Sequence, residues 1–208
     1  MILVSSPLRV SLAGGGTDLP AWCSKHCGLV ITSSIDLRVY VAVNRRYDNR
    51  IRVAYMKTEM VDSISKLKHD LVRETLRHYG VPEGGVEISS IADAPASSGL
   101  GSSGAVGLAF LKALDILEGR TRTRRDLAEA VFSIEHDILG KDTGKQDSFA
   151  SVFGGINCLQ ISTRNDVEIQ PVKMAYSEIS KLWRHLALFD TKYYRAARFV
   201  LRKQTESI

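Results

Sequence analysis

A stretch of the chain, Ser102–Leu117, is apolar on nearly every side, and a segment rich in glycine and serine, Ala94–Ala105, leads into it. A helix that is hydrophobic all round is buried, so the rest of the chain has to surround it. Gly119 follows the stretch as a helix stop. With 208 residues, of which 44% are apolar and 25% charged, the chain is long enough to build such a core in one domain, or in one domain and part of another.

Strand-forming residues dominate the first half of the chain and helical periodicity the second half. We expect strands over 8–12, 28–35, 37–44, 51–55 and 86–91, with a hairpin turn at 47–50. We expect helices over 64–79, ended by Gly80, and over 124–139, capped by Thr123. Further strands are expected over 152–161, 167–172 and 186–189, and a basic helix over 193–203. Polar residues cluster at 162–166, which suggests a boundary between domains 1–161 and 162–208.

Composition excludes several classes of protein. No apolar run is long enough to span a membrane, and the N-terminus lacks the basic flank of a signal peptide, so we expect a cytoplasmic protein. The three cysteines cannot form a disulfide framework, and Cys23, His26 and Cys27 lack the second ligand pair that a zinc site needs. The net charge of +5 favours an anionic partner, but no aromatic–basic pattern indicates nucleic acid.

The segment Ala94–Ala105 has the composition of a phosphate-binding loop. Its glycines allow close approach of the backbone, and the start of the following helix offers free N–H groups to an anion. Four serines add hydroxyls that can bind phosphate oxygens or a metal ion: Ser97, Ser98, Ser102 and Ser103. A plain surface loop is the alternative.

Three glycines of the same segment, Gly99, Gly101 and Gly104, also satisfy the dinucleotide-binding pattern G-x-G-x-x-G, with Glu118 as the later acidic residue. Such a turn leaves its strand abruptly, whereas several residues including Pro95 intervene here. A dinucleotide-dependent oxidoreductase is therefore the weaker hypothesis.

Residues Pro95–Gly104 resemble the ATP-phosphate motif of the GHMP kinases, P-x-x-x-G-L-G-S-S-A, with Gly104 in place of the final alanine. The resemblance implies that the loop wraps the phosphates of ATP and that Ser102, or as second choice Ser103, approaches Mg²⁺. The ATP contacts expected from the motif are Pro95, Ser97, Ser98, Gly99, Leu100, Gly101, Ser102 and Ser103.

A second segment, Arg9–Pro20, reads by itself as a strand that ends in a glycine turn. It is similar to the sugar-binding motif of the same family, and its G-G-G-T-D form is most like the heptose 7-phosphate kinase branch. The resemblance implies that Arg9 sits beside the reacting hydroxyl and that four residues bind the substrate: Gly15, Gly16, Thr17 and Asp18. A carboxylate suits sugar hydroxyls because it offers only acceptors.

A third segment, Ile134–Gly155, holds two carboxylates suited to phosphoryl transfer, Glu135 and Asp147. Alone, they read as a solvated helix end and a cap. Beside the family pattern G-x-x-D-x-x-A-x-x-x-G-G, Asp147 corresponds to the base, and Glu135 with Ser102 corresponds to the Mg²⁺ ligands. Lys145 is an alternative phosphate contact.

The resemblance covers Leu8–Cys158 and implies an α+β fold: the N-terminal domain of a GHMP kinase, a sheet backed by helices with a left-handed βαβ crossover, and only the start of a second domain. The implied activity is transfer of phosphate from ATP, with Mg²⁺, to a sugar or sugar phosphate such as a heptose 7-phosphate. No glycine follows Gly155, so the family's closing motif is missing. We therefore also expect that the chain is truncated, that its exposed half-core favours a homo-oligomer, and that a non-catalytic nucleotide-binding protein is the alternative.

Overall fold

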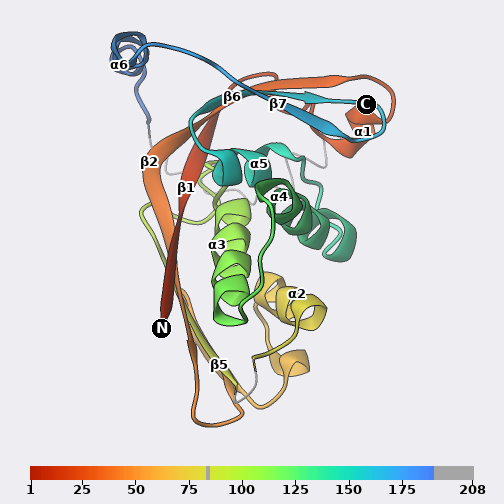
Figure 1. Ribbon diagram of the computed structural model, residues 1–208, viewed down its shortest axis with the longest axis vertical. Coiled ribbons are helices and arrows are strands. Elements are labelled where there is room, and N and C mark those ends of the chain that lie inside the picture. Colours follow the sequence, from red (N-terminus) through yellow and green to blue (C-terminus); the bar gives the residue numbers. More distant parts are fainter. Residues whose placement is uncertain (83–84, 190–208) are drawn as a thin grey trace.

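The computed structural model describes residues 1–82 and 85–189 of the chain and consists of one mixed sheet, with the helices between residues 70 and 153 packed on one face (Figure 1). The strands within these residues are β1 (Ile2–Ala13), β2 (Gly28–Arg45), β3 (Ile51–Ala54), β4 (Thr58–Val61), β5 (Val86–Ala92), β6 (Ile156–Ile161) and β7 (Val167–Pro171). The helices are α1 (Pro20–Cys23), α2 (Asp70–Tyr79), α3 (Ser102–Leu117), α4 (Arg124–Ser133), α5 (Gln146–Phe153) and α6 (Tyr176–Arg184). Shorter turns cover Ile64–Lys66, a 3₁₀ turn, and Ile134–Ile138, a π-helical turn.

Strand β2 organises the sheet because it pairs with β1 over most of its length and with β5 and β6 over two separate parts, 39–45 and 28–33. The order is β4-β3-β5-β2-β6-β7, with β1 also on β2. The α+β fold class is confirmed. The expected pair of strands 28–35 and 37–44 is one long strand, and the expected hairpin between 37–44 and 51–55 is wrong, since β5 lies between β2 and β3.

The parallel pair β3 and β5 is joined through α2 and forms a βαβ unit. The handedness of this crossover stays a prediction. α2 ends as expected at Gly80, which has a left-handed φ of 88° and whose N–H bonds the carbonyl of Leu76. Its start at Asp70 lies later than expected because residues 64–66 form the separate 3₁₀ turn.

The buried helix predicted over 102–117 is confirmed as α3, which packs between the sheet and the other helices. Its core partners on the sheet include Leu8, Val39 and Val41. A second contact joins α3 to α4 through Leu111 and Val131. The N-terminal end of α3 lies against β1 and α5, because a Cβ at Gly101 would meet Arg9 and a Cβ at Gly104 would meet Asp147.

The C-terminal part of the sheet is built on a smaller core around Val30, Phe149 and Leu159. The strand expected over 152–161 is partly wrong: α5 runs to Phe153, and β6 begins only at Ile156. The polar cluster 162–166 is the turn between β6 and β7, in which Ser162 Oγ accepts from the N–H groups of Arg164 and Asp166. The sheet thus continues to Pro171, and the position of the domain boundary stays a prediction.

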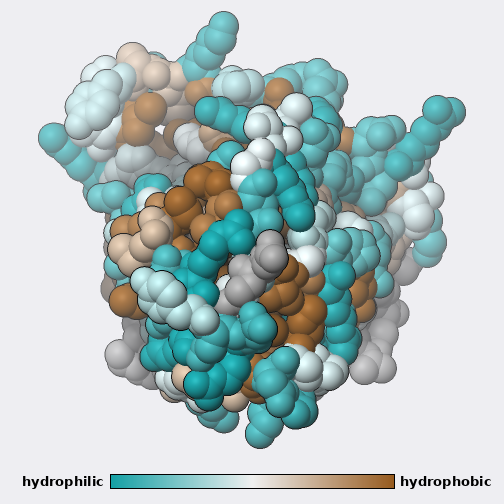
Figure 2. All heavy atoms as spheres, turned by 60° about the horizontal axis from the view of Figure 1, so that its bottom comes forward, coloured by the Kyte–Doolittle hydropathy of each residue, from teal (hydrophilic) through white to brown (hydrophobic). Residues whose placement is uncertain are grey.

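Residues 186–189, expected as a buried strand, are exposed and form no strand, with Phe189 82% exposed. Hydrophobicity alone suggested a strand there, but the side chains of Leu186 and Leu188 are exposed as well. The expected helix over 193–203 lies outside the described residues. Within them, no helix is both long and apolar enough to cross a membrane. Apolar side chains nevertheless reach the surface in patches between hydrophilic ones (Figure 2).

Candidate functional site

Arg9 brings together three segments that lie far apart in the sequence. Its Nε and Nη2 atoms contact Asp147 Oδ1 at 2.7 and 2.5 Å, and its Nη1 donates to the carbonyl of Gly99 at 2.6 Å. Its backbone N–H donates to the carbonyl of Leu100. The second half of β1, the glycine–serine loop and the first turn of α5 therefore meet at one arginine, as the three candidate segments require.

An irregularity in the sheet directs Arg9 toward this meeting point. Pro7 pairs with Arg38, but Arg9 already pairs with Ser34, so β2 bulges between these positions. Bulges re-aim side chains and are common beside active sites. Here Leu8 enters the core while Arg9 reaches the loop in front of α3.

The glycine–serine loop has the backbone of an anion cradle. Gly99 and Gly101 have φ values of 78° and 72°, and Ser97 adopts a left-handed φ of 64° despite its side chain. Non-glycine residues in this region carry backbone strain of about 1 kcal/mol or more, and such strain clusters at functional sites. Gly101 is the N-cap of α3, and no side chain caps the helix, so the first N–H groups of α3 are available to an anion.

Ser98 adds a hydroxyl for which the fold provides no partner. Its Oγ is buried and makes no hydrogen bond within the described structure. A buried hydroxyl without a partner is costly, which favours a ligand oxygen at this position. Leu100 instead points into the core beside α3, so its role in the loop is packing.

The glycine turn after β1 is held against β2 by its backbone and by Thr17. A Cβ at Gly14 would lie 1.9 Å from the carbonyl oxygen of Leu29, and Thr17 Oγ1 accepts from the N–H of Leu29 at 3.0 Å. Thr17 is therefore engaged in holding the turn. Gly15 is exposed and Gly16 half-buried, and both remain candidates for substrate contact.

Asp18 is 5% exposed and binds backbone N–H groups on both sides of the site. Its Oδ1 accepts from Gly16 at 3.2 Å and its Oδ2 from Gln146 at 3.0 Å. Burial raises the pKa of this carboxyl, and the neighbouring charge of Asp147 raises it further. Asp18 thus connects the glycine turn to the residue before Asp147; its contact with a sugar hydroxyl stays a prediction.

Glu135 faces the start of α3 from the π-helical turn. It is 3% exposed and accepts a short hydrogen bond from Ser103 Oγ, while Lys141 Nζ lies 3.7 Å from its Oε1. Burial raises the pKa of Glu135. The expected role of Ser102 as a Mg²⁺ ligand stays a prediction, and Ser103, the second choice, is the serine that reaches the carboxylate. Helical geometry explains the difference: successive residues of a helix point about 100° apart.

The residues around Glu135 suit Mg²⁺. The described residues contain no group of three His, Cys, Asp or Glu side chains that could hold a metal by themselves. Magnesium, however, is commonly bound by one or two carboxylates or hydroxyls, with substrate phosphates and water completing the shell. Glu135 and Ser103 supply one carboxylate and one hydroxyl beside the loop that is a candidate for phosphates. Lys141 was not expected at this site, and nothing in its spacing pointed to it.

We predict that Glu135→Gln makes the chain more stable at pH 7 by about 1 kcal/mol, because it removes a buried charge while keeping the hydrogen bond from Ser103. The raised pKa means that the folded state favours the protonated carboxyl, so the stability of the parent chain falls as the pH rises from the ordinary pKa of glutamate toward the raised one. The gain should therefore vanish below about pH 4. Urea unfolding at pH 4 and pH 7 measures it; an unchanged or lower stability at pH 7 contradicts the prediction.

Lys145, the alternative phosphate contact, is 4% exposed and already bound. Its Nζ donates to both carboxylate oxygens of Glu129, at 2.9 and 2.7 Å, and to the carbonyl of Asn165 at 2.7 Å. The ammonium also lies over the rings of Phe132 and Phe149. These contacts leave the ammonium no donor for a phosphate, and Lys145 instead anchors the start of α5 to α4 and to the β6–β7 turn.

We predict that Lys145→Met lowers the free energy of unfolding by about 2 kcal/mol, since Glu129 and the Asn165 carbonyl lose their donor. ATP affinity should change less than about threefold. The exposed Lys173→Met is the control for removal of a charge. A loss of ATP affinity above about tenfold with unchanged stability would instead assign Lys145 to the phosphates.

The dinucleotide-binding reading fails on topology. Such folds need a mostly parallel sheet with the glycine turn directly after a strand, whereas β5 is antiparallel to β2 and parallel only to β3. Glu118, the acidic residue of that pattern, pairs with Arg45 at 2.7 Å. Gly104 has a different reason to be glycine, because a Cβ there would lie 3.0 Å from the Cβ of Asp147.

A known protein family matches the part of the chain that holds the glycine–serine loop, Glu135 and Asp147. Residues 65–155 match the family model described as the GHMP kinases N terminal domain. Over 208 residues, the chain is 26% identical to the D-glycero-alpha-D-manno-heptose 7-phosphate kinase of Campylobacter jejuni, which covers 95% of this chain and 61% of that protein. It is also 26% identical over 184 residues to a galactokinase of Chloroflexus aurantiacus, which covers 82% of this chain and 45% of that protein. The chain thus spans less than two thirds of the curated relatives it matches.

Solved structures agree. The crystal structure of a D-glycero-D-manno-heptose 1-phosphate kinase from Bacteroides thetaiotaomicron superposes with a TM-score of 0.80 at 29% identity, over 88% of this chain and 63% of that one. A sugar kinase structure from Campylobacter jejuni gives a TM-score of 0.74 at 26% identity, over 86% and 58% of the two chains. A mevalonate kinase at 18% identity shares the fold, with a TM-score of 0.66.

Proposed function

The chain carries a GHMP kinase N-terminal domain, and from this premise we propose that it serves ATP-dependent phosphoryl transfer to a hydroxyl of a sugar or sugar phosphate. Arg9 supports this proposal most directly, because it contacts both the carbonyl of Gly99 in the phosphate loop and the carboxylate of Asp147. One residue thereby couples the place for the triphosphate to the place for a base.

In the proposed reaction, Asp147 takes the proton of the acceptor hydroxyl. Both contacts from Arg9 go to Oδ1, so Oδ2 is left for the hydroxyl, and the Asp147 side chain is 24% exposed. The hydroxyl oxygen attacks the γ-phosphorus, its O–H bond breaks toward Asp147, and the bond to the ADP oxygen breaks. Phosphoryl transfer requires little covalent chemistry from the protein, so positioning and charge stabilisation dominate its catalysis.

The phosphates lie, in this proposal, along the loop from Ser97 to Ser103 and against the first N–H groups of α3. Ser98 contributes its unpartnered hydroxyl. Glu135 with Ser103 would hold Mg²⁺, which neutralises charge on the phosphate oxygens when bound. Lys141 Nζ lies 3.7 Å from Glu135 Oε1 and adds a positive charge beside this proposed Mg²⁺ site.

A heptose phosphate is the acceptor that we propose, on the strength of two relatives. The curated relative from Campylobacter jejuni is named a heptose 7-phosphate kinase, and the solved structure from Bacteroides thetaiotaomicron a heptose 1-phosphate kinase. The G-G-G-T-D turn supports the same branch, with Gly15, Gly16 and Asp18 nearest to the acceptor. The net charge of +5 suits a substrate that is itself a phosphate.

A coupled assay for ADP release tests the function. Heptose 7-phosphate, galactose and mevalonate are offered with ATP and Mg²⁺, to this chain and to a chimera that continues with the C-terminal part of the Campylobacter jejuni relative. We expect turnover with the heptose phosphate only. ATP binding without turnover in either protein would support the non-catalytic alternative, and turnover with galactose alone would overturn the proposed substrate.

A further inference from the structure

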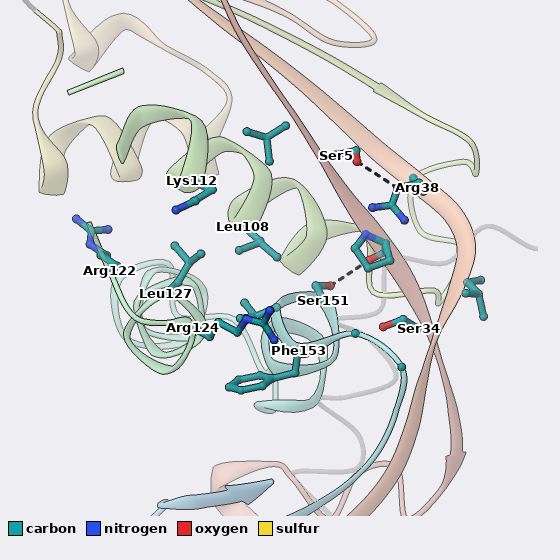
Figure 3. Close-up of a pocket in the computed structure, with 16 residues that line it drawn as sticks. Ser5, Ser34, Arg38, Leu108, Lys112, Arg122, Arg124, Leu127, Ser151 and Phe153 are labelled. Atoms are coloured by element: carbon teal, nitrogen blue, oxygen red, sulfur yellow. Dashed lines mark hydrogen bonds between the residues drawn. The ribbon is translucent and has the colours of Figure 1, made fainter. Parts of the chain in front are cut away.

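A cavity of about 560 Å³ lies between the sheet and the helices and shares no lining residue with the candidate site. It opens between β1 and β2 on one side and α3, α4 and α5 on the other (Figure 3). From α3 it takes Leu108 and Lys112, well beyond the helix start, and from α5 it takes the last turn, Ser151–Phe153, and Gly154–Gly155. At 1.5 Å per helical residue, Lys112 lies about 15 Å from Ser102 along α3, so the two sites are separate.

The charged side chains that line this cavity all carry the same sign of charge. Four cationic side chains line it, Arg38, Lys112, Arg122 and Arg124, and no aspartate or glutamate does. They come from β2, α3 and the start of α4, so the fold collects them from distant parts of the sequence. Lys112, Arg122 and Arg124 lie on the helical side, and Arg38 lies on the strand side with Ser5 (Figure 3). Such a concave, one-sign surface concentrates anions.

Two of these cations have donors to spare. The Arg122 guanidinium lies over the ring of Tyr79 and contacts the buried Asp115 at 3.4 Å, but its Nη1 is buried without a hydrogen-bond partner in the described structure. The Arg124 side chain makes no hydrogen bond or ion pair within the same residues. Asp115 offsets part of the charge of Arg122 and also interacts with Lys112, while Arg38 and Arg124 keep their charge.

The apolar part of the lining indicates that the anion has an organic group. Leu108, Leu127 and Phe153 present apolar surface between the two charged ends. The serine hydroxyls that line the cavity already have partners. Ser151 of α5 donates to the carbonyl of Pro7, Ser34 of β2 donates to the carbonyl of Ala150, and Ser5 of β1 accepts from Arg38. The volume is in the range of small-molecule sites and larger than one inorganic phosphate requires.

We propose that this basic cavity binds a phosphorylated organic molecule, with the phosphate on Lys112, Arg122 and Arg124 and the organic part on Leu108, Leu127 and Phe153. Arginine pairs with phosphate through two parallel N–H donors, which suits this cluster. The inference does not rest on the proposed kinase activity, because none of these residues belongs to the candidate catalytic site.

Chemical-shift titration of the ¹⁵N-labelled chain locates the binding directly. The probes are phenyl phosphate, inorganic phosphate and phenol, none of which is a nucleotide or a sugar. We expect phenyl phosphate to bind about tenfold more tightly than either of the others. Its largest amide shifts should fall at Arg124, Gly154 and Gly155. AMP and glucose 6-phosphate then show which organic part the apolar wall prefers.

Variants decide whether the named cations are responsible. Lys112→Met with Arg124→Gln should weaken phenyl phosphate binding at least about tenfold, while Arg164→Gln, an exposed arginine of the β6–β7 turn, should leave it unchanged. Thermal unfolding checks that the double variant is folded. Shifts confined to residues 97–103, no shifts at about 10 mM phenyl phosphate, or equal binding by the double variant would each overturn the site.

Discussion

Asp147→Ala is expected to lower the rate of phosphoryl transfer by about 10³-fold while ATP affinity stays within about threefold. The carboxylate is the partly exposed acid at the start of α5, and Arg9 holds it beside the carbonyl of Gly99. Its removal takes away the proton acceptor without touching the loop proposed for the phosphates. ADP release measures the rate, and calorimetry with ATP measures the affinity.

The matched control is Asp137→Asn, which removes an exposed carboxylate near the candidate site. Within the described residues, this carboxylate accepts a hydrogen bond from Ser133. It should keep the rate of the parent chain. Asp147→Asn separates charge from shape, since the amide keeps the size of the side chain and cannot take the proton. If either Asp147 variant kept more than about a third of the turnover, Asp147 would not be the base.

Gly144→Ala is expected to lower the free energy of unfolding by about 3 kcal/mol. A Cβ at this position would lie 2.0 Å from Asp18 Oδ2 and 2.9 Å from the Asp18 carbonyl carbon, and backbone cannot yield as a side chain can. The same change would push Asp18 off the N–H of Gln146, and so displace the first turn of α5. Urea unfolding gives the loss of stability.

The control for this substitution is Gly15→Ala, where a Cβ would meet only the side chain of Ser11, which can rotate away. A second test adds Asp18→Ala to Gly144→Ala: with the carboxylate gone, the cost of the alanine should shrink by about 1 kcal/mol or more. A loss under about 1 kcal/mol for Gly144→Ala alone would show that the turn adjusts freely.

Local patterns in the sequence predicted much of the helical layer. The apolar run 102–117 became α3 with the expected bounds, and Thr123 caps α4 through the N–H of Asp126. Strand pairing was less accessible, because periodicity identifies a strand but does not name its neighbour. The insertion of β5 between β2 and β3 depends on which edges meet after folding, and this overturned the expected hairpin.

In the candidate site, too, local patterns predicted which residues take part but not which of them are in contact. Motifs along the chain named Arg9, the serine–glycine loop, Glu135 and Asp147, and they placed these residues in order. They did not show that Ser103 rather than Ser102 reaches Glu135, because that depends on the rotation of α3 about its axis. Nor did they show that Lys145 is occupied by Glu129 and Asn165.

Local patterns in the chain were enough to show which helix is buried and which residues have the chemistry for phosphate and proton transfer, because composition and spacing are local properties. Which of those residues touch depends on the folded arrangement. Arg9 and Asp147 are 138 positions apart, and their contact exists because a bulge in β2 turns one toward α3 while the packing of α5 brings the other to the same place. Contacts of that kind are set by sheet register and helix packing, which no local pattern records.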